Sequence, residues 1–192
     1  MQKAVIESQE KHVAESAKPE DNISPALKWE EESLHPKVFR NALGKYPTGV
    51  AIVATTTADG TPIGLTINSF ASLSLEPPLV LWSLGEQSPN LKNFNECKYF
   101  TINVLAEDQQ DLAMKFASSK VADKFSGTSY SLSDEGAPVI DGAIATLICS
   151  NEKQDHAGDH MLFFGKVLRV DANDDEPLVF HSGSFTSLLG TD

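Results

Sequence analysis

The residues best suited to chemistry are the two histidines of the run His156-Ala157-Gly158-Asp159-His160, which precedes an apolar stretch typical of a strand. His160 is of most interest, because an imidazole changes charge near neutral pH and can accept or pass a proton. Asp159 either orients that imidazole or simply caps the turn. Histidines at this spacing can also bind a metal. However, no cysteine or further carboxylate cluster lies close in the sequence, so the run does not favour a metal site.

A second group of candidates lies in the stretch 65–78. Apolar residues alternate there with small polar ones, as in a half-buried strand, and the polar side carries Thr66, Asn68, Ser72 and Ser74. The alternation slips around Asn68 to Phe70, which predicts a bend or a bulge. Uncharged hydroxyl and amide groups suit a planar polar ligand or a phosphate. Taken alone, the stretch favours an ordinary solvent-facing strand.

A third candidate is an anion site around Ser83 and Ser88. Ser83 closes an apolar run that predicts a buried strand, and Ser88-Pro89 predicts the start of a helix, with a hydroxyl cap followed by proline. A helix N-terminus presents unpaired N–H groups and a partial positive charge to an anion. Ser88 can equally serve as a cap alone, and the residues by themselves slightly favour that role.

Composition limits the classes of partner. The chain of 192 residues is long enough for one domain with a hydrophobic core, and its net charge of −12 argues against nucleic acid or an anionic membrane as partner. Any phosphate must therefore be held by local donors. Cys97 and Cys149 fall in no metal or redox spacing and are read as free thiols. No apolar run suggests a membrane span or a signal peptide, so a cytoplasmic protein is predicted.

The elements that must position these residues are mostly strands. Residues 1–33 are polar and Glu-rich, which predicts a flexible N-terminal extension before a domain at 34–192. A short helix is expected at 36–45. Strands are expected at 50–57, 61–67, 79–84, 99–105, 143–149, 161–170 and 178–181, and helices after Ser88 and at 108–116. This order predicts a mainly β fold, an antiparallel barrel of the Greek-key type with peripheral helices.

Several short motifs follow one another between Phe39 and Leu188. They are Phe39-Arg40, Tyr46-Pro47-Thr48-Gly49-Val50, Thr66-Ile67-Asn68-Ser69-Phe70, Ser74-Leu75-Glu76-Pro77-Pro78-Leu79-Val80, Phe100-Thr101-Ile102-Asn103-Val104-Leu105, Gly136-Ala137-Pro138, Asp141-Gly142-Ala143 and Gly158-Asp159-His160. Their order and spacing resemble the flavin reductase family of the FMN-binding split barrel, the small reductases that serve two-component monooxygenases. The chain has no GxGxxG, P-loop or GxSxG motif, so neither a Rossmann site nor a nucleophile elbow is expected.

The resemblance implies a cofactor site and a catalytic pair. Residues implied to bind the flavin are Gly49, Thr66, Asn68, Ser69, Phe70, Ser72, Ser83, Ser88 and Asn90. The turn at Ser88 would hold the FMN phosphate, although Asn90 stands where the family usually has threonine. Phe70 packs either on the flavin ring or in the core. His160, with Asp159, would face the nicotinamide side of the flavin.

The function that the resemblance implies is hydride transfer from NAD(P)H to FMN or FAD, with reduced flavin passed to a partner monooxygenase. A different class of protein, a flavin- or heme-binding split-barrel module without catalysis, is the alternative. A relative of pyridoxamine-phosphate oxidase is a third possibility, and the sparse cations expected near the site argue against it. NADH is favoured weakly over NADPH, while FMN and FAD are not distinguished. A homodimer is expected, because a split barrel leaves strand edges that a second subunit covers.

Overall fold

A computed structural model describes residues 35–188. Its helical segments and strands are α1 (Pro36–Leu43), β1 (Thr48–Gly49), β2 (Ala51–Thr56), β3 (Pro62–Ile67), β4 (Ala71–Leu75), β5 (Pro78–Gly85), α2 (Leu91–Glu96), β6 (Tyr99–Val104), η2 (Glu107–Gln109), α3 (Gln110–Ala117), β7 (Tyr130–Leu132), β8 (Pro138–Ile140), β9 (Ala145–Ala157), β10 (His160–Ala172), β11 (Val179–His181) and β12 (Ser184–Thr186). The predicted extension 1–33 lies outside the described residues.

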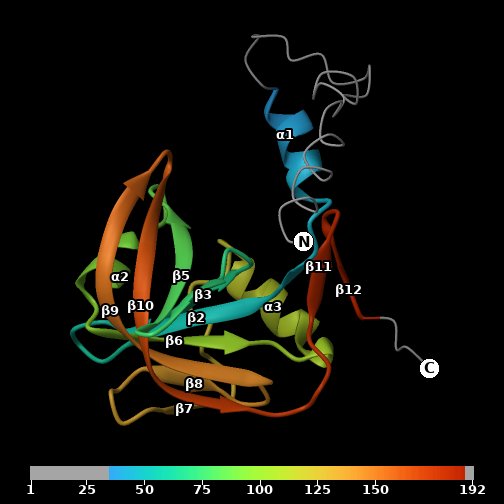
Figure 1. The fold of residues 1–192 in the computed structure, drawn as a ribbon. Helices are drawn as coiled ribbons and strands as arrows, with labels where there is room; N and C mark the ends of the chain where they lie inside the picture. Colours follow the sequence, from blue (N-terminus) through green and yellow to red (C-terminus); the bar gives the residue numbers. More distant parts are fainter. Residues whose placement is uncertain (1–34, 189–192) are drawn as a thin grey trace, which may run out of the picture. The chain divides into compact units, whose positions relative to one another are not determined.

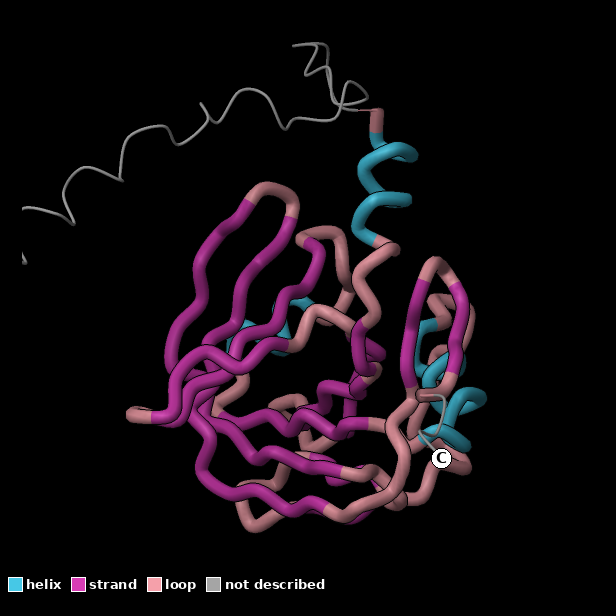
Figure 2. Tube along the Cα trace, turned by 45° about the vertical axis from the view of Figure 1, so that its right-hand side comes forward, coloured by secondary structure: helices cyan, strands magenta, loops and turns pink. Residues whose placement is uncertain are grey.

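Most of the fold is one antiparallel sheet of seven strands in the order β3-β2-β6-β9-β10-β5-β4 (Figure 1). The sheet is strongly bent, so that β9 and β10 rise along one side and then turn under β6 (Figures 1 and 2). A three-stranded sheet β1-β11-β12 and the pair β7-β8 complete the strands among the described residues. The prediction of a mainly β, antiparallel fold with peripheral helices is therefore confirmed.

The stretch 65–78, predicted as one bent strand, is divided between two strands. β3 ends at Ile67 and β4 begins at Ala71, and these two strands are the outermost members of the sheet at opposite ends of its order. The slip in the alternation thus marks a complete departure from the ladder. The prediction of a half-buried strand is wrong for β4, where Leu73 is 48% exposed and Leu75 is 95% exposed.

The hairpin of β9 and β10 is much longer than its apolar pattern predicts. The segment expected to connect the two strands is itself paired up to Ala157 opposite His160, with only Gly158 and Asp159 in the turn. Gly158 has φ +66, a left-handed conformation that glycine adopts at little cost. A polar strand whose residues are exposed on both faces shows no alternation, which is why the local pattern missed it.

Two apolar cores lie on opposite faces of the sheet. Trp82 stacks on Phe163 with ring centroids 4.3 Å apart, and the edges of Phe94 and Phe100 close the first core. The second core lies under α3, where Phe116 meets Phe125 edge-on at 5.1 Å. The core that includes Trp82 backs the end of β5, so that strand gives a rigid base to whatever its terminal residues bind.

Smaller differences concern four short strands. β1, β7, β8 and β12 were not predicted, because strands of two or three residues carry no periodic signal.

Cys97 and Cys149 are free, as predicted, and burial raises the pKa of the Cys149 thiol to about 12. Within residues 35–188, no helix is long and apolar enough to cross a membrane.

Candidate functional site

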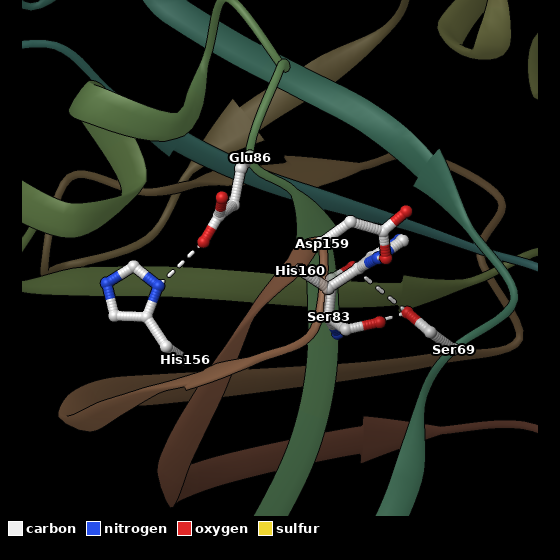
Figure 3. A network of polar contacts seen from close by, with 6 residues as sticks. All are labelled: Ser69, Ser83, Glu86, His156, Asp159 and His160. Atoms are coloured by element: carbon white, nitrogen blue, oxygen red, sulfur yellow. Dashed lines mark hydrogen bonds and ion pairs between the residues drawn. The ribbon is translucent and has the colours of Figure 1, made fainter.

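The end of β5 brings together Ser69 and Ser83 from two parts of the chain (Figure 3). The backbone N–H of Ser83 donates to Ser69 Oγ at 3.1 Å, and that hydroxyl donates to the Ser83 carbonyl at 3.2 Å. After the chain leaves β3, the Ser69 side chain therefore supplies the hydrogen bonds that a neighbouring strand would supply. Its hydroxyl proton is already used, so Ser69 has only acceptor capacity left for a ligand.

His160 lies beside this serine pair, at the start of β10. It pairs with Gly85, the last residue of β5. Its Nε2 lies 3.8 Å from the position that a Cβ on Gly85 would occupy. Nδ1 contacts Asp159 Oδ1 at 2.7 Å, and that hydrogen bond is the main cause that lowers the pKa of Asp159. With Nδ1 engaged by the carboxylate, Nε2 is the nitrogen left for a ligand.

Three further predicted residues are placed differently from one another. Thr66 Oγ1 donates to the Ala113 carbonyl at 2.6 Å, so its hydroxyl faces α3. Phe70 is half-buried and packs against the first core, as the simpler of its two interpretations had it. Ser72 is exposed on β4, opposite Val80. Of these three, only Ser72 presents its side chain freely to solvent, and their role in binding stays a prediction.

Asn68 lines a cleft of about 570 Å³, together with Thr48 and residues of α1 and the β11–β12 hairpin. We call it the Arg40 cleft, because Arg40 and Lys45 both line it. Thr48 Oγ1 is buried there and has no hydrogen-bond partner among the described residues, so a polar ligand atom would complete it. The neighbouring Gly49 is exposed, and a Cβ on it would meet nothing within 4 Å, so close packing does not require glycine at this position.

Asn90 lines a separate cleft of about 560 Å³, which we call the Lys124 cleft. Ser118, Ser119 and Lys124 also line it. Lys124 is half-buried, and burial lowers the pKa of its ammonium below the ordinary value of 10.5. Nζ donates to the Phe116 carbonyl at 2.6 Å, which leaves two of its three N–H donors. A desolvated cation beside hydroxyl and amide groups is suited to an anion such as a phosphate.

The predicted helix start at Ser88 is wrong by two residues. The helix begins at Leu91 with Asn90 as its N-cap residue, and Pro89 precedes it. Ser88 instead forms a turn, in which its Oγ accepts from the Asn90 N–H at 3.3 Å and its own N–H donates to the Gly85 carbonyl at 2.9 Å. The serine therefore shapes the link between β5 and α2 and does not cap the helix.

Comparison with known proteins decides the family. The profile described as a flavin reductase like domain matches residues 43–189. The chain belongs to the flavin reductase family. It is 46% identical over 147 residues to a protein of Agrobacterium fabrum named FMN reductase (NADH) SmoA, and the match spans 77% of this chain and 83% of that protein.

Two further proteins are similar to this chain at lower identity. The reductase subunit HsaB of a flavin-dependent monooxygenase from Rhodococcus jostii is 39% identical over 158 residues, which cover 82% of this chain and 80% of that one. A solved structure of the NADH:FAD oxidoreductase SgcE6 from Streptomyces globisporus, in complex with NAD and FAD fragments, has a TM-score of 0.77 at 33% identity. That match covers 83% of this chain and 98% of SgcE6. The predicted family is therefore confirmed.

The sequence analysis did not single out the cations of the two clefts that Asn68 and Asn90 line. Arg40, Lys45 and Lys124 line the two clefts, although few cations were expected near the site. The family match decides against a pyridoxamine-phosphate oxidase relative, without recourse to the number of cations near the site. The sequence does offer a signal that could have found these cations. Positive charges are scarce in this acidic chain, and Arg40 and Lys45 both lie near the end of the predicted helix.

Proposed function

We propose that this protein is an NADH-dependent flavin reductase that supplies reduced FMN to a partner monooxygenase. The observation that carries the proposal is the placement of the Asp159–His160 pair beside Ser69 and Ser83, in a chain that belongs to the flavin reductase family. When bound, FMN would supply the chemistry of accepting hydride from NADH and passing the electrons onward. The protein supplies the binding groups and the positioned histidine. A non-catalytic flavin- or heme-binding module is not favoured, because the relatives carry reductase names.

The direct test is to mix purified protein with NADH and FMN and to follow nicotinamide absorbance. Oxidation of NADH that depends on added FMN is expected, with slower oxidation of NADPH. The same assay with FAD in place of FMN ranks the two flavins. A protein that binds FMN but never oxidises either nicotinamide would instead be the binding module.

The phosphate of FMN would lie in the Lys124 cleft. Lys124 offers the charge there, and Asn90 and Ser118 offer uncharged groups that can donate to phosphate oxygens. Ser83 lies within β5, and Ser88 lies on the link that leads from β5 to Asn90. This assignment places the anion by a local cation in an otherwise acidic chain, as its net charge of −12 requires.

Replacing Lys124 with Gln is expected to weaken FMN binding roughly three- to tenfold, because a partly exposed charge contact to the phosphate is lost. Riboflavin, which has no phosphate, should bind the variant and the wild type equally. In the wild type, FMN affinity should fall as pH rises through the pKa of Lys124, which burial sets below 10.5, since only the ammonium attracts the anion. Fluorescence titration with both flavins measures each effect.

Lys115→Gln is the matched control. Like Lys124, Lys115 hydrogen-bonds within the region of α3 and the loop that follows it: its Nζ donates to the Ser126 carbonyl at 2.6 Å and to Thr128 Oγ1 at 2.8 Å. Lys115 does not line the Lys124 cleft. Its loss tests the stability of the loop without touching the proposed anion site. An equal loss of FMN and riboflavin affinity in Lys124→Gln would place the phosphate elsewhere.

A homodimer is proposed from the exposed outer strand of the sheet. β4 is an edge strand, and its Leu73 and Leu75 side chains are exposed among the described residues. Natural proteins seldom leave an apolar strand edge uncovered, because it promotes aggregation. Sedimentation of the wild type is expected to give twice the mass of the chain, and Leu75→Glu should shift the protein toward the monomer. A wild-type monomer with full reductase activity would refute the dimer.

The partner that receives reduced flavin is proposed to be a flavin-dependent monooxygenase, because HsaB is named as the reductase subunit of such an enzyme. A cytoplasmic location is proposed with it. The free thiols of Cys97 and Cys149 suit a reducing compartment.

A further inference from the structure

The turn that carries His160 is tied to the end of β5 by Glu86 (Figure 3). The backbone N–H of Glu86 donates to the Asp159 carbonyl at 3.0 Å, and its carboxylate contacts His156 Nδ1 at 2.6 Å. One residue beyond β5 therefore holds both the turn and the last residues of β9. We propose that His156 and Glu86, the latch pair, position His160 against β5. The inference rests on the role of His160 proposed above.

Strand register places the latch pair behind the site. Met161 pairs with His156 on one side and with Leu84 on the other, whereas His160 pairs with Ala157 and Gly85. Because side chains alternate between the faces of a sheet, His156 and His160 project to opposite faces. Met161 and Leu84 are buried in the first core, so His156 projects on the same face of the sheet as this core. The tip of the hairpin extends past the edge of the core, so His156 itself is exposed. His156 therefore acts on a ligand of His160 only through the turn.

The hairpin tip needs such a tie. Residues 155–160 are all exposed, and the pairing of β10 with β5 ends at His160 opposite Gly85. The Asp159–His160 contact lies within the turn and moves with it, so it fixes the imidazole to the turn but not the turn to the sheet. Strand ends without packed neighbours open locally at low cost. The contacts of Glu86 join this tip to the rigid base given by β5.

Removing either member of the latch pair should slow flavin reduction without unfolding the protein. The side chains of His156 and Glu86 are 74% and 35% exposed, and a polar contact between side chains this accessible contributes little to global stability. His156→Gln and Glu86→Gln are each expected to lower the NADH-dependent reduction of the FMN-loaded protein about two- to fivefold. The melting temperature and the FMN affinity should stay near the wild-type values.

Two comparisons separate positioning from a general structural role. The double variant should be no slower than either single variant, because the two residues act through one contact. In a His160→Ala background, His156→Gln should cause no further loss, because the latch pair acts through His160. Lys153→Gln is the matched control: it breaks an exposed ion pair with Asp155 at 2.5 Å that lies wholly within β9, and it should leave the rate unchanged.

Amide hydrogen exchange gives a readout that does not depend on activity. Both latch variants should speed exchange of the Glu86 N–H, which is bonded to the turn, while Lys153→Gln should not. Unchanged exchange, or slower reduction that persists in the His160→Ala background, would overturn the latch. A wild type that oxidises no NADH would overturn the proposed function instead, and the exchange experiment would still decide whether the tie exists.

Discussion

Replacing His160 with Ala is expected to lower kcat/KM for NADH about ten- to a hundredfold, the effect of losing one positioned hydrogen bond near the reacting groups. FMN affinity should be nearly unchanged, because the groups proposed to bind the flavin lie at 66–72 and 83–90 and in the Lys124 cleft. Stopped-flow reduction of the FMN-loaded variant over a range of NADH concentrations separates weaker NADH binding from slower hydride transfer.

A purely structural histidine would behave differently. Its loss would lower the melting temperature and FMN affinity together, with turnover per bound flavin unchanged. Asp159→Asn is the graded companion, since it keeps the shape of the side chain that contacts Nδ1 at 2.7 Å but removes its charge, and it should cost less than the loss of the imidazole. A His160→Ala protein that melts normally and reduces its flavin at the wild-type rate at every NADH concentration removes His160 from the reaction.

The largest loss of stability is expected from Asn103→Leu. The buried side chain donates to the Ile52 carbonyl at 3.1 Å and to Thr101 Oγ1 at 3.0 Å, and it accepts from the Ile140 N–H at 3.0 Å and from Thr146 Oγ1 at 3.2 Å. Leucine fills a similar volume but leaves the Ile140 N–H without its acceptor. The expected cost is about 3–5 kcal/mol, from one orphaned donor and three lost hydrogen bonds. Thermal melting should show a fall of roughly 6–20 °C.

Asn95→Leu, an exposed substitution of the same kind in α2, is the control and should shift melting by little. Thr146→Val removes one of the four contacts and should fall between the two. A small effect of Asn103→Leu would mean that the loop before β9 does not depend on this amide. The result also bears on the motif that contains Asn103, whose amide joins β2, β6, β8 and β9 and does not reach the proposed site.

The parts of the fold that were predictable are those set by neighbouring residues. The β-branched run of β2, the turn at Asp59-Gly60 and the return strand β3 form a hairpin, and Gly60 has the positive φ of +85 that such a turn requires. The length of β9 was not predictable, because its polar half carries no alternation and is specified by pairing with β10. A local sequence pattern reports the burial of its own segment, whereas the length of a strand also depends on the strand with which it pairs.

The site follows the same rule. His160 and Asp159 are adjacent in sequence, and their contact was one of the two interpretations open from the residues alone. The contacts of Ser69 with Ser83, of Glu86 with His156 and of Lys124 with Phe116 join positions that no spacing rule connects. The family resemblance supplied the candidate residues, and their roles stay a prediction. It could not show that the Ser69 hydroxyl is already occupied or that Ser88 caps no helix.

The short link from Ile67 to Ala71 has a consequence for how the chain folds. β2–β3 and β4–β5 are hairpins between neighbouring strands, which close within microseconds, whereas the pairing of β6 with β9 joins Tyr99 to Ser150 far along the chain. The link between the two hairpins can reach its native conformation only after that distant pairing has placed both of them in one sheet. We therefore expect Asn68 and Ser69 to reach their native positions late in folding, and flavin binding to become possible only when folding is complete.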